Sequence, residues 1–148
     1  MTDTVDAATR SRIMAGVGSA NTKPELQLRH MMHARGFRYR LHDRSLPGSP
    51  DLVFRRYQVA CFVHGCFWHQ HPGCSKARIP SSRREYWVPK FERNVARDLE
   101  VRQALGGDGW RVAIVWECAL TQSRVIATVD EFASWLCSDQ MAFETPIA

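Results

Sequence analysis

"PDLVFRRYQVACFVH", residues 50–64, contains two apolar segments separated by a short polar stretch. Residues 52–54 form the first segment, and residues 59–63 form the second, which is apolar throughout. A turn between two such segments predicts a β-hairpin. The hairpin begins directly after Asp51 and ends at His64, so a polar side chain lies at each end of this apolar pair.

Further elements are expected on both sides of this hairpin. The capping-box pattern Thr22-Lys23-Pro24-Glu25 begins a helix that Gly36 should end. Periodicity and turn residues then predict a strand over 37–41, a loop over 64–82, a long helix over 83–105, a buried strand over 110–116 and an amphipathic helix over 123–137. The apolar side of this last helix would carry Val125, Ile126, Val129, Phe132 and Leu136. The order α-β-β-β-α-β-α predicts an α/β fold, with a mixed central sheet flanked by helices.

The length and composition are those of one globular domain. Of the 148 residues, 45% are hydrophobic and 24% are charged, which is ordinary for a globular protein. We expect a domain over 22–140, an N-terminal arm over 1–21 and a tail over 141–148. The net charge of +5 and the pI near 9.2 favour an anionic partner, with nucleic acid first. The sequence shows neither a secretory signal nor an apolar run of about 20 residues, which predicts a cytoplasmic protein without membrane spans.

Cysteine and histidine are concentrated in HGCFWHQHPGC, residues 64–74. Four residues of suitable type and spacing could hold one metal ion: Cys66, His71, Cys74 and, further along the chain, Cys118. A Cys₃His set is typical of a closed structural zinc site. The alternative is a group of unrelated buried thiols, but clustered Cys and His in a cytoplasmic protein favour metal. The two other cysteines, Cys61 and Cys137, lie on apolar faces and are expected in the core.

A second site is indicated around Asp51, which follows a Gly/Pro turn at the start of a strand, as in many metal-dependent nucleases. The second arm of the hairpin carries no carboxylate and no lysine. A Mg²⁺ ion would therefore be held by Asp51, a backbone carbonyl near Val63, waters and phosphate oxygens, since Mg²⁺ keeps much of its water. His64 and His69 would then do the acid and base work of phosphodiester cleavage. The alternative is that both are ordinary surface or hydrogen-bonded histidines.

Five stretches together resemble the very short patch repair (Vsr) DNA mismatch endonucleases: ATRSRIM, LPGSPDLVF, FVHGCFWHQHPGC, REYWVPKFERNVARD and GWRVAIVWECAL. They run from about Ala8 to Leu120, and the motif at 64–74 is long and chemically unusual. The resemblance implies a type II restriction endonuclease-like core of the PD-(D/E)xK type with an added structural zinc site. It also implies an enzyme that nicks DNA 5′ to the T of a T:G mismatch, which arises by deamination of 5-methylcytosine.

The resemblance also assigns roles to the two predicted sites. Asp51 would be the central Mg²⁺ ligand, with the Val63 carbonyl beside it. His69 would be the general base or would position the water, and His64 would assist at the scissile phosphate. The four Cys and His residues named above would bind Zn²⁺.

Glu25 and Asp98 have two interpretations. From its position, Glu25 caps its helix, and Asp98 lies beside Arg97 on a solvated face of the long helix. From the resemblance, Glu25 supports the metal–water network and Asp98 supports His69. The two roles of Glu25 are compatible, because a capping residue can also be catalytic.

Aromatic and basic residues complete the implied DNA-binding surface. The side chains that would insert beside the mismatch, by resemblance, are Phe67, Trp68, Trp87 and, from the arm, Met14. Unstacking costs less at a mismatch, so such a wedge favours mispaired DNA. The alternative places the three aromatic residues in the core. The candidate phosphate contacts are Arg10, Arg12, Arg83, Arg84, Lys90 and Arg93.

The chain departs from the family pattern at two positions. Val63 replaces the usual threonine, and Cys74 lies one residue further from His71 than in a known family member.

Other functions also fit parts of the sequence. The alternatives are a zinc-stapled mismatch-binding module without catalysis, a catalytic zinc hydrolase, and a restriction-like nuclease acting on paired DNA. The resemblance implies two partners, double-stranded DNA with a T:G mismatch and the repair protein MutL. We expect a monomer, because a nicking enzyme needs one active site.

Overall fold

The computed structural model describes residues 21–147 of the chain. These residues form three α-helices and five strands: α2 (Lys23–Ala34), β1 (Arg40–Leu41), β2 (Leu52–Phe54), β3 (Val59–His64), α3 (Arg84–Gly107), β4 (Arg111–Trp116), α4 (Val125–Leu136) and β5 (Ala142–Glu144). None of the helices within this range is long and apolar enough to cross a membrane.

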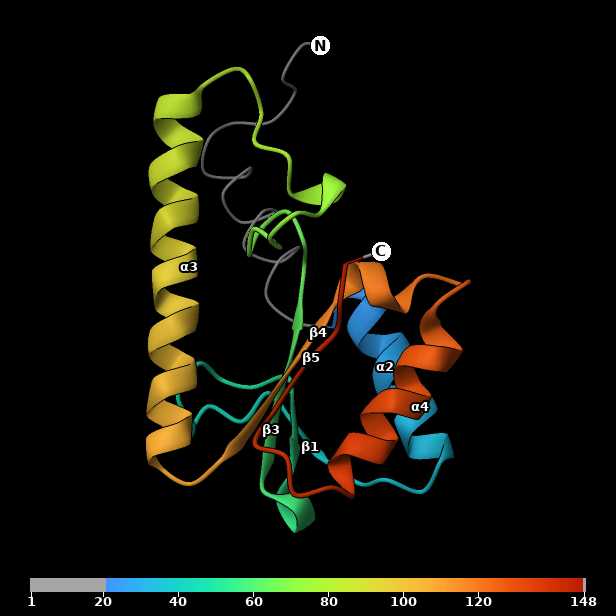
Figure 1. Ribbon diagram of the computed structural model, residues 1–148. Helices are drawn as coiled ribbons and strands as arrows, with labels where there is room; N and C mark the ends of the chain where they lie inside the picture. Colours follow the sequence, from blue (N-terminus) through green and yellow to red (C-terminus); the bar gives the residue numbers. More distant parts are fainter. Residues whose placement is uncertain (1–20, 148) are drawn as a thin grey trace.

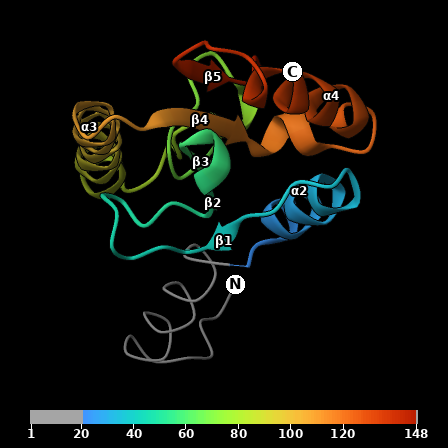
Figure 2. The ribbon, with the colours of Figure 1, turned by 90° about the horizontal axis from the view of Figure 1, so that it is seen from below.

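The five strands form one mixed sheet in the order β1-β2-β3-β4-β5. The pairs β1–β2 and β2–β3 are antiparallel, whereas β3–β4 and β4–β5 are parallel. This confirms the predicted hairpin and the predicted mixed sheet. The helix α3 provides the long crossover that the parallel pair β3–β4 requires. It lies on one side of the sheet, while α2 and α4 lie on the other (Figures 1 and 2).

The apolar run of β3 is explained by burial on both faces of the sheet. Successive side chains of a strand point to opposite faces. Val59 and Cys61 belong to the core between the sheet and the pair α2 and α4. Ala60 and Phe62 belong to a second core, which includes Leu105 of α3. A central strand covered by helices on both sides therefore has no polar face.

The turn before Asp51 passes close to α3. Gly48 in this turn has a φ of +74°, and a Cβ at this position would lie only 2.5 Å from Cγ1 of Val101. Both the backbone conformation and the space therefore require glycine. This close contact fixes the segment that leads into Asp51.

The strand β5 was not predicted, because the sequence placed residues 141–148 in a tail. Arg111 holds the preceding segment against the sheet. Its guanidinium donates to the carbonyls of Leu136 at 2.8 Å and Gln140 at 2.9 Å, and it lies 4.5 Å from the centre of the Trp135 ring. These contacts join the end of α4 to the start of β5.

Three smaller predictions were wrong. The strand expected over 37–41 is paired only at Arg40 and Leu41. Ile126, expected on the buried face of α4, is 64% exposed, because one helical step of about 100° turns it away from the buried Val125. Cys137, expected in the core, follows the last turn of α4 and is exposed.

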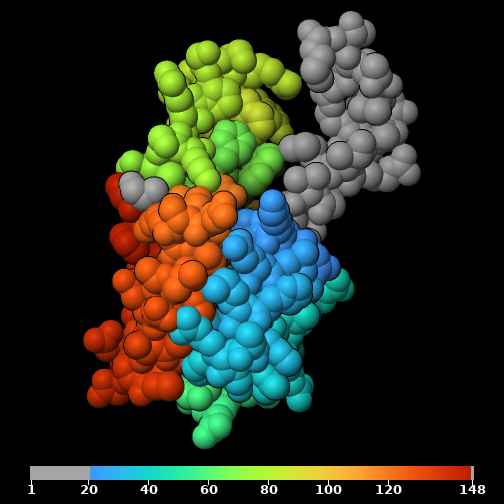
Figure 3. Space-filling view, turned by 90° about the vertical axis from the view of Figure 1, so that its right-hand side faces the viewer, coloured from blue at the N-terminus to red at the C-terminus, as the bar shows by residue number. Residues whose placement is uncertain are grey.

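The loop over 64–82 leaves the carboxyl end of β3 and contains one short 3₁₀ turn, Ser75–Ala77. In Figure 3 its residues form a lobe at one end of the molecule, above the face made by α2 and α4. Because this loop carries many of the predicted site residues, the site is expected at the end of the sheet where β3 and β4 finish.

Candidate active site and metal centre

Asp51 immediately precedes β2 and faces the end of β3. Its Oδ2 accepts a hydrogen bond from the backbone N–H of Val63 at 2.8 Å, which fixes the carboxylate beside this peptide. Burial, together with repulsion from the Glu25 carboxylate, raises the pKa of Asp51 to about 7. A bound cation would offset this repulsion, so the two carboxylates fit a metal site.

Glu25 lies in the first turn of α2 and is only 1% exposed. Its backbone N–H donates to Oγ1 of Thr22 at 3.4 Å, which confirms the N-cap. The Glu25 carboxylate is directed elsewhere: Oε2 accepts from Arg29 at 3.0 Å and lies 2.9 Å from Nε2 of His42. Ligand atoms of Glu25, His42 and Asp51 all lie within 4.8 Å of one another. Glu25 therefore belongs to the same cluster as Asp51.

His42 was missed in the sequence analysis. It follows β1 with a φ of +48°, and its backbone N–H donates to the carbonyl of Asp51 at 3.1 Å. The antiparallel register pairs Leu41 with Leu52, and one further step places His42 opposite Asp51. The signal was available only once this pairing was known, because a hydrophobic pattern does not specify the register of such a short strand.

His64 and His69 form a stacked pair, with ring centroids 3.8 Å apart and planes inclined by 4°. Nδ1 of His69 lies 2.8 Å from Oδ2 of Asp98, which comes from α3. Asp98 is thus more than the solvated surface charge that its position suggested. Because the carboxylate holds Nδ1, Nε2 is the nitrogen of His69 that is left to exchange a proton.

His64 is the last residue of β3 and is 5% exposed. Burial, together with the neighbouring His69, lowers the pKa of His64 to about 3, so its ring is neutral near pH 7. Within residues 21–147, its Nδ1 has no hydrogen-bond partner. Because Nδ1 is buried, a hydrogen bond from the neutral ring to a substrate group would have to come from Nε2.

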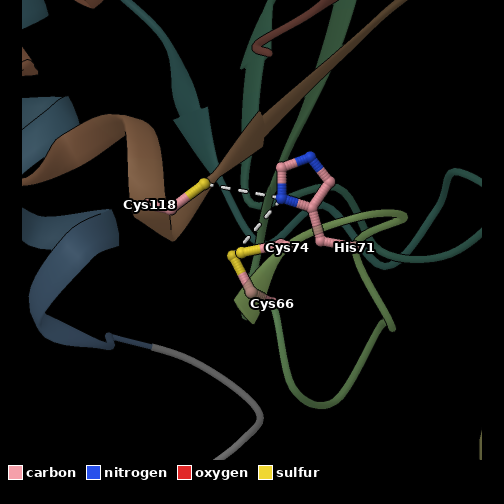
Figure 4. A group of neighbouring side chains, drawn as sticks. All are labelled: Cys66, His71, Cys74 and Cys118. Atoms are coloured by element: carbon pink, nitrogen blue, oxygen red, sulfur yellow. Dashed lines mark hydrogen bonds between the residues drawn. The ribbon is translucent and has the colours of Figure 1, made fainter. Parts of the chain in front are cut away.

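The four predicted zinc ligands converge from two distant segments of the chain (Figure 4). Sγ of Cys66 and Sγ of Cys118 lie 3.6 and 3.4 Å from Nδ1 of His71, and the cluster includes Cys74, with all four ligand atoms within 4.8 Å of one another. Cys118 lies in the 3₁₀ turn Glu117–Leu120, directly after β4. Burial, with the neighbouring Cys118 thiol, raises the pKa of Cys66 to about 12. Three thiols and an imidazole at this spacing fit a tetrahedral metal ion, which would also stabilise the thiolates.

Comparison with known proteins identifies the family of this chain. The family described as DNA mismatch endonuclease Vsr matches residues 2–76. The DNA mismatch endonuclease Vsr of Escherichia coli (strain K12) is 39% identical over 142 residues, which cover 94% of this chain and 90% of the relative. The type II nicking enzyme V.XorIIP of Xanthomonas oryzae pv. oryzae is 49% identical over 121 residues, which cover 82% of this chain and 88% of the relative.

The chain belongs to the Vsr family. It is therefore a DNA endonuclease, and DNA is its substrate. The resemblance found in the sequence is confirmed, and the alternative of a binding module without catalysis is set aside.

The three predicted wedge residues of this Vsr chain contact one another beside the site. The ring of Phe67 lies 5.0 Å from Trp68, 5.5 Å from Trp87 and 5.0 Å from the buried Phe91. Phe67, Trp68 and Trp87 are only half-buried. Phe67 and Trp87 pack on Phe91, but none of the three is a core residue, so part of each side chain is available to a partner.

Tyr86 extends this aromatic group and was not predicted. It is 46% exposed, and its ring lies 5.0 Å from that of Trp87. Two predicted phosphate contacts lie over the same ring, Arg83 at 5.1 Å and Lys90 at 6.0 Å from its centre. The basic and aromatic candidates therefore share one surface at the start of α3.

The remaining predicted DNA contacts are two residues on α3 and three on the predicted arm over 1–21. Arg84 and Arg93 are exposed on α3. The three candidates on the arm, Arg10, Arg12 and Met14, lie outside the described residues.

Proposed function

We propose that this Vsr-family endonuclease nicks the T strand of a T:G mismatch, 5′ to the T, with Mg²⁺ at the Asp51 site and Zn²⁺ in the Cys/His cluster. One observation carries the proposal: an oxygen-rich cluster, a histidine pair and a thiol-rich cluster adjoin the end of β3. The first two supply the groups that phosphodiester hydrolysis needs. The third supplies the means to hold the loop that bears His69.

The residues fit the two metal ions by donor type. Asp51 and the Val63 carbonyl would offer oxygen ligands to Mg²⁺, with Glu25 ordering its waters, because Mg²⁺ prefers oxygen and keeps several waters. The cation would supply Lewis acidity for water activation and for the charge on the phosphoryl group. In the Cys/His cluster, four protein ligands would leave no open position, so Zn²⁺ there would be structural.

The side chains of the protein would perform the proton transfers. Nε2 of His69 would take a proton from the attacking water, while Asp98 holds the ring in the required tautomer and orientation. His64, which is neutral near pH 7, would hydrogen-bond to the scissile phosphate through Nε2, because its Nδ1 is buried. The stacked arrangement keeps the two imidazoles on the same side of the reacting group.

The aromatic group would supply the preference for mismatched DNA. Insertion of Phe67, Trp68 and Trp87 into the base stack requires local unstacking, which costs less where the bases are mispaired. Arg83, Lys90 and the other basic candidates would contact phosphates. A restriction endonuclease-like monomer in the cytoplasm, working with MutL, completes the proposal.

A strand-resolved nicking assay tests this function. Labelled duplexes carrying one T:G mismatch in varied flanking sequence are incubated with Mg²⁺ and protein, beside T:A duplexes and the Asp51→Asn variant. We expect one nick, 5′ to the mismatched T, that the variant does not produce. Equal cleavage of the T:A duplexes would reject mismatch specificity and favour a nuclease acting on paired DNA.

A further inference from the structure

We propose that Trp116 is a positioning residue that links the Cys/His cluster to the His64–His69 pair, and that β5 fixes Trp116 through Glu144. The inference rests on the proposed function, because it assumes that the histidine pair acts on DNA. It assigns a role to the C-terminal strand, for which the sequence indicated none.

Four aromatic rings form a continuous series between the two sites. The Trp116 ring is stacked on His71 of the Cys/His cluster, with centroids 4.1 Å apart and planes inclined by 6°. Trp116 also contacts His64 edge-on, with ring centroids 5.1 Å apart and planes inclined by 75°. His64 is in turn stacked on His69. Any rotation of the Trp116 ring would therefore displace His64.

The backbone places Trp116 and His64 side by side, but it does not set the orientation of the indole. The two residues are register partners at the ends of β4 and β3. The indole Nε1 of Trp116 donates to Oε2 of Glu144 at 2.8 Å, and its backbone N–H donates to Oγ1 of Thr145 at 2.9 Å. Trp116 is 3% exposed, and in this structure its indole N–H depends on the Glu144 carboxylate for a hydrogen bond. Glu144 therefore selects one orientation of the ring.

The helix α3 supports this arrangement at two points. Arg102 donates to Oε1 of Glu144 at 3.2 Å, while Asp98 contacts His69. Asp98 and Arg102 are four residues apart and so lie on the same face of the helix. One helical face thus holds His69 directly and holds Trp116 through Glu144.

The test compares Glu144→Ala with Glu144→Gln, in which the amide oxygen can still accept from the indole. Trp110→Phe is the matched control, because Trp110 packs in the same core at the opposite end of β4. The measurements are the single-turnover nicking rate on a T:G duplex, the KM for that duplex, the zinc content, and the imidazole NMR resonances of His64 and His69.

We expect Glu144→Ala to lower the nicking rate at saturating DNA by about 10- to 100-fold, with zinc content and KM near the wild-type values. The imidazole resonances should shift or broaden in this variant. Glu144→Gln should stay within about threefold of the wild-type rate and keep the wild-type resonances.

A Glu144→Ala protein with the wild-type rate and unchanged imidazole resonances would overturn the inference. A similar loss of rate in Trp110→Phe would also overturn it, since general destabilisation of the core would then explain both. If the wild-type protein fails to nick any T:G duplex, the proposed function fails, and the imidazole resonances alone decide whether Glu144 positions the pair.

Discussion

Two clusters of metal-binding type adjoin the end of β3, and they differ in donor chemistry and in completeness. The Cys/His cluster offers four side chains, three of them thiols, from the loop after β3 and the turn after β4. The other cluster offers Glu25, His42 and Asp51 from three separate segments of the chain. Soft, complete ligand sets suit structural zinc, whereas carboxylates with space for water suit catalytic magnesium. In the proposed function, the first cluster would hold the loop that bears His69 beside the second.

The two clusters also differ in how protons compete with metal. Burial raises the pKa of Cys66 to about 12, so this thiol keeps its proton near pH 7 until a metal displaces it. Burial raises the pKa of Asp51 only to about 7, so a large fraction of this carboxyl is already ionised at neutral pH. A cation at Asp51 would therefore compete with protons near neutral pH, whereas a metal in the Cys/His cluster would have to displace the proton of the Cys66 thiol.

Removal of the carboxylate at position 51 should have the largest effect. We expect Asp51→Asn to lower the single-turnover nicking rate by at least about 1,000-fold, because the central cation ligand is lost. DNA affinity, measured by fluorescence anisotropy in the absence of cleavage, should be retained or increased, since a negative charge is removed. Residual nicking above a tenth of the wild-type rate would show that Asp51 is not the central ligand.

Loss of one thiol from the Cys/His cluster should be nearly as severe. We expect Cys118→Ser to lose its zinc, to unfold at lower temperature and to nick at least about 100-fold more slowly, because the loop bearing His69 is released. Cys137→Ser is the control, since Cys137 is exposed and lies outside the cluster. Metal analysis and thermal unfolding check this. A zinc-free Cys118→Ser protein with normal activity would contradict a structural role for the cluster.

We expect Asp98 to affect the nicking reaction only through its contact with His69. We expect Asp98→Asn to reduce the nicking rate by about 10- to 100-fold with little change in KM, because the imidazole loses the carboxylate that orients it. Glu100→Gln provides a control on an exposed position of the same helix. Equal rates for the two variants would mean that the contact between Asp98 and His69 has no part in the reaction.

In the metal-free protein, the buried carboxyl of Asp51 should make the free energy of unfolding depend on pH. The raised pKa of Asp51 means that the folded chain keeps a proton that the unfolded chain releases between about pH 4 and 7. Stability is therefore lost as pH rises through this range, by up to about 1.4 kcal/mol per pH unit. The pKa of His64 is lowered to about 3, so this residue has the opposite effect on stability: it makes stability rise with pH up to about pH 6.5. This contribution is the same in wild type and in an Asp51→Asn variant, so it cancels in their difference.

Urea unfolding of wild type and Asp51→Asn without metal isolates this contribution. The stability of the variant relative to wild type should increase from pH 4 to pH 7. A difference that does not change with pH would mean that the carboxyl of Asp51 titrates in the folded protein as it does in the unfolded chain.

The smallest effect is expected at Val63. The contact to Asp51 uses the backbone N–H of Val63, and the proposed metal ligand is its carbonyl, so the side chain takes no direct part. We expect Val63→Thr, which restores the usual family residue, to nick within about threefold of wild type. An increase of tenfold or more would show that the missing hydroxyl orders a water at the site.

The hairpin and the Cys/His cluster could be predicted because their signals are local and specific. An apolar run of five residues and a spacing of Cys, His and Cys each have few interpretations. His42 and Asp98 could not be assigned from local pattern, since the first depends on the register of a two-residue strand and the second on which face of α3 meets the loop. The resemblance supplied Asp98 but not His42.

The strand β5 escaped prediction for a similar reason. It has only three residues, two of them exposed, and no alternation can be recognised over so short a segment. Its position depends on contacts far away in the sequence, from Arg111 and from Trp116. Cys137 was wrongly expected to be buried because its exposure depends on where α4 ends. Ile126 was wrongly expected to be buried because one helical step turns it away from the core.

The proposed function requires a structural metal in one cluster and a catalytic metal in the other. The decisive experiment is nicking of a T:G duplex by protein that has been dialysed against a chelator and resupplied with Mg²⁺ alone, with zinc measured in the same sample. We predict one zinc per chain throughout, no nicking before Mg²⁺ is added and full activity afterwards. Nicking that follows the zinc content and needs no Mg²⁺ would contradict this division of roles.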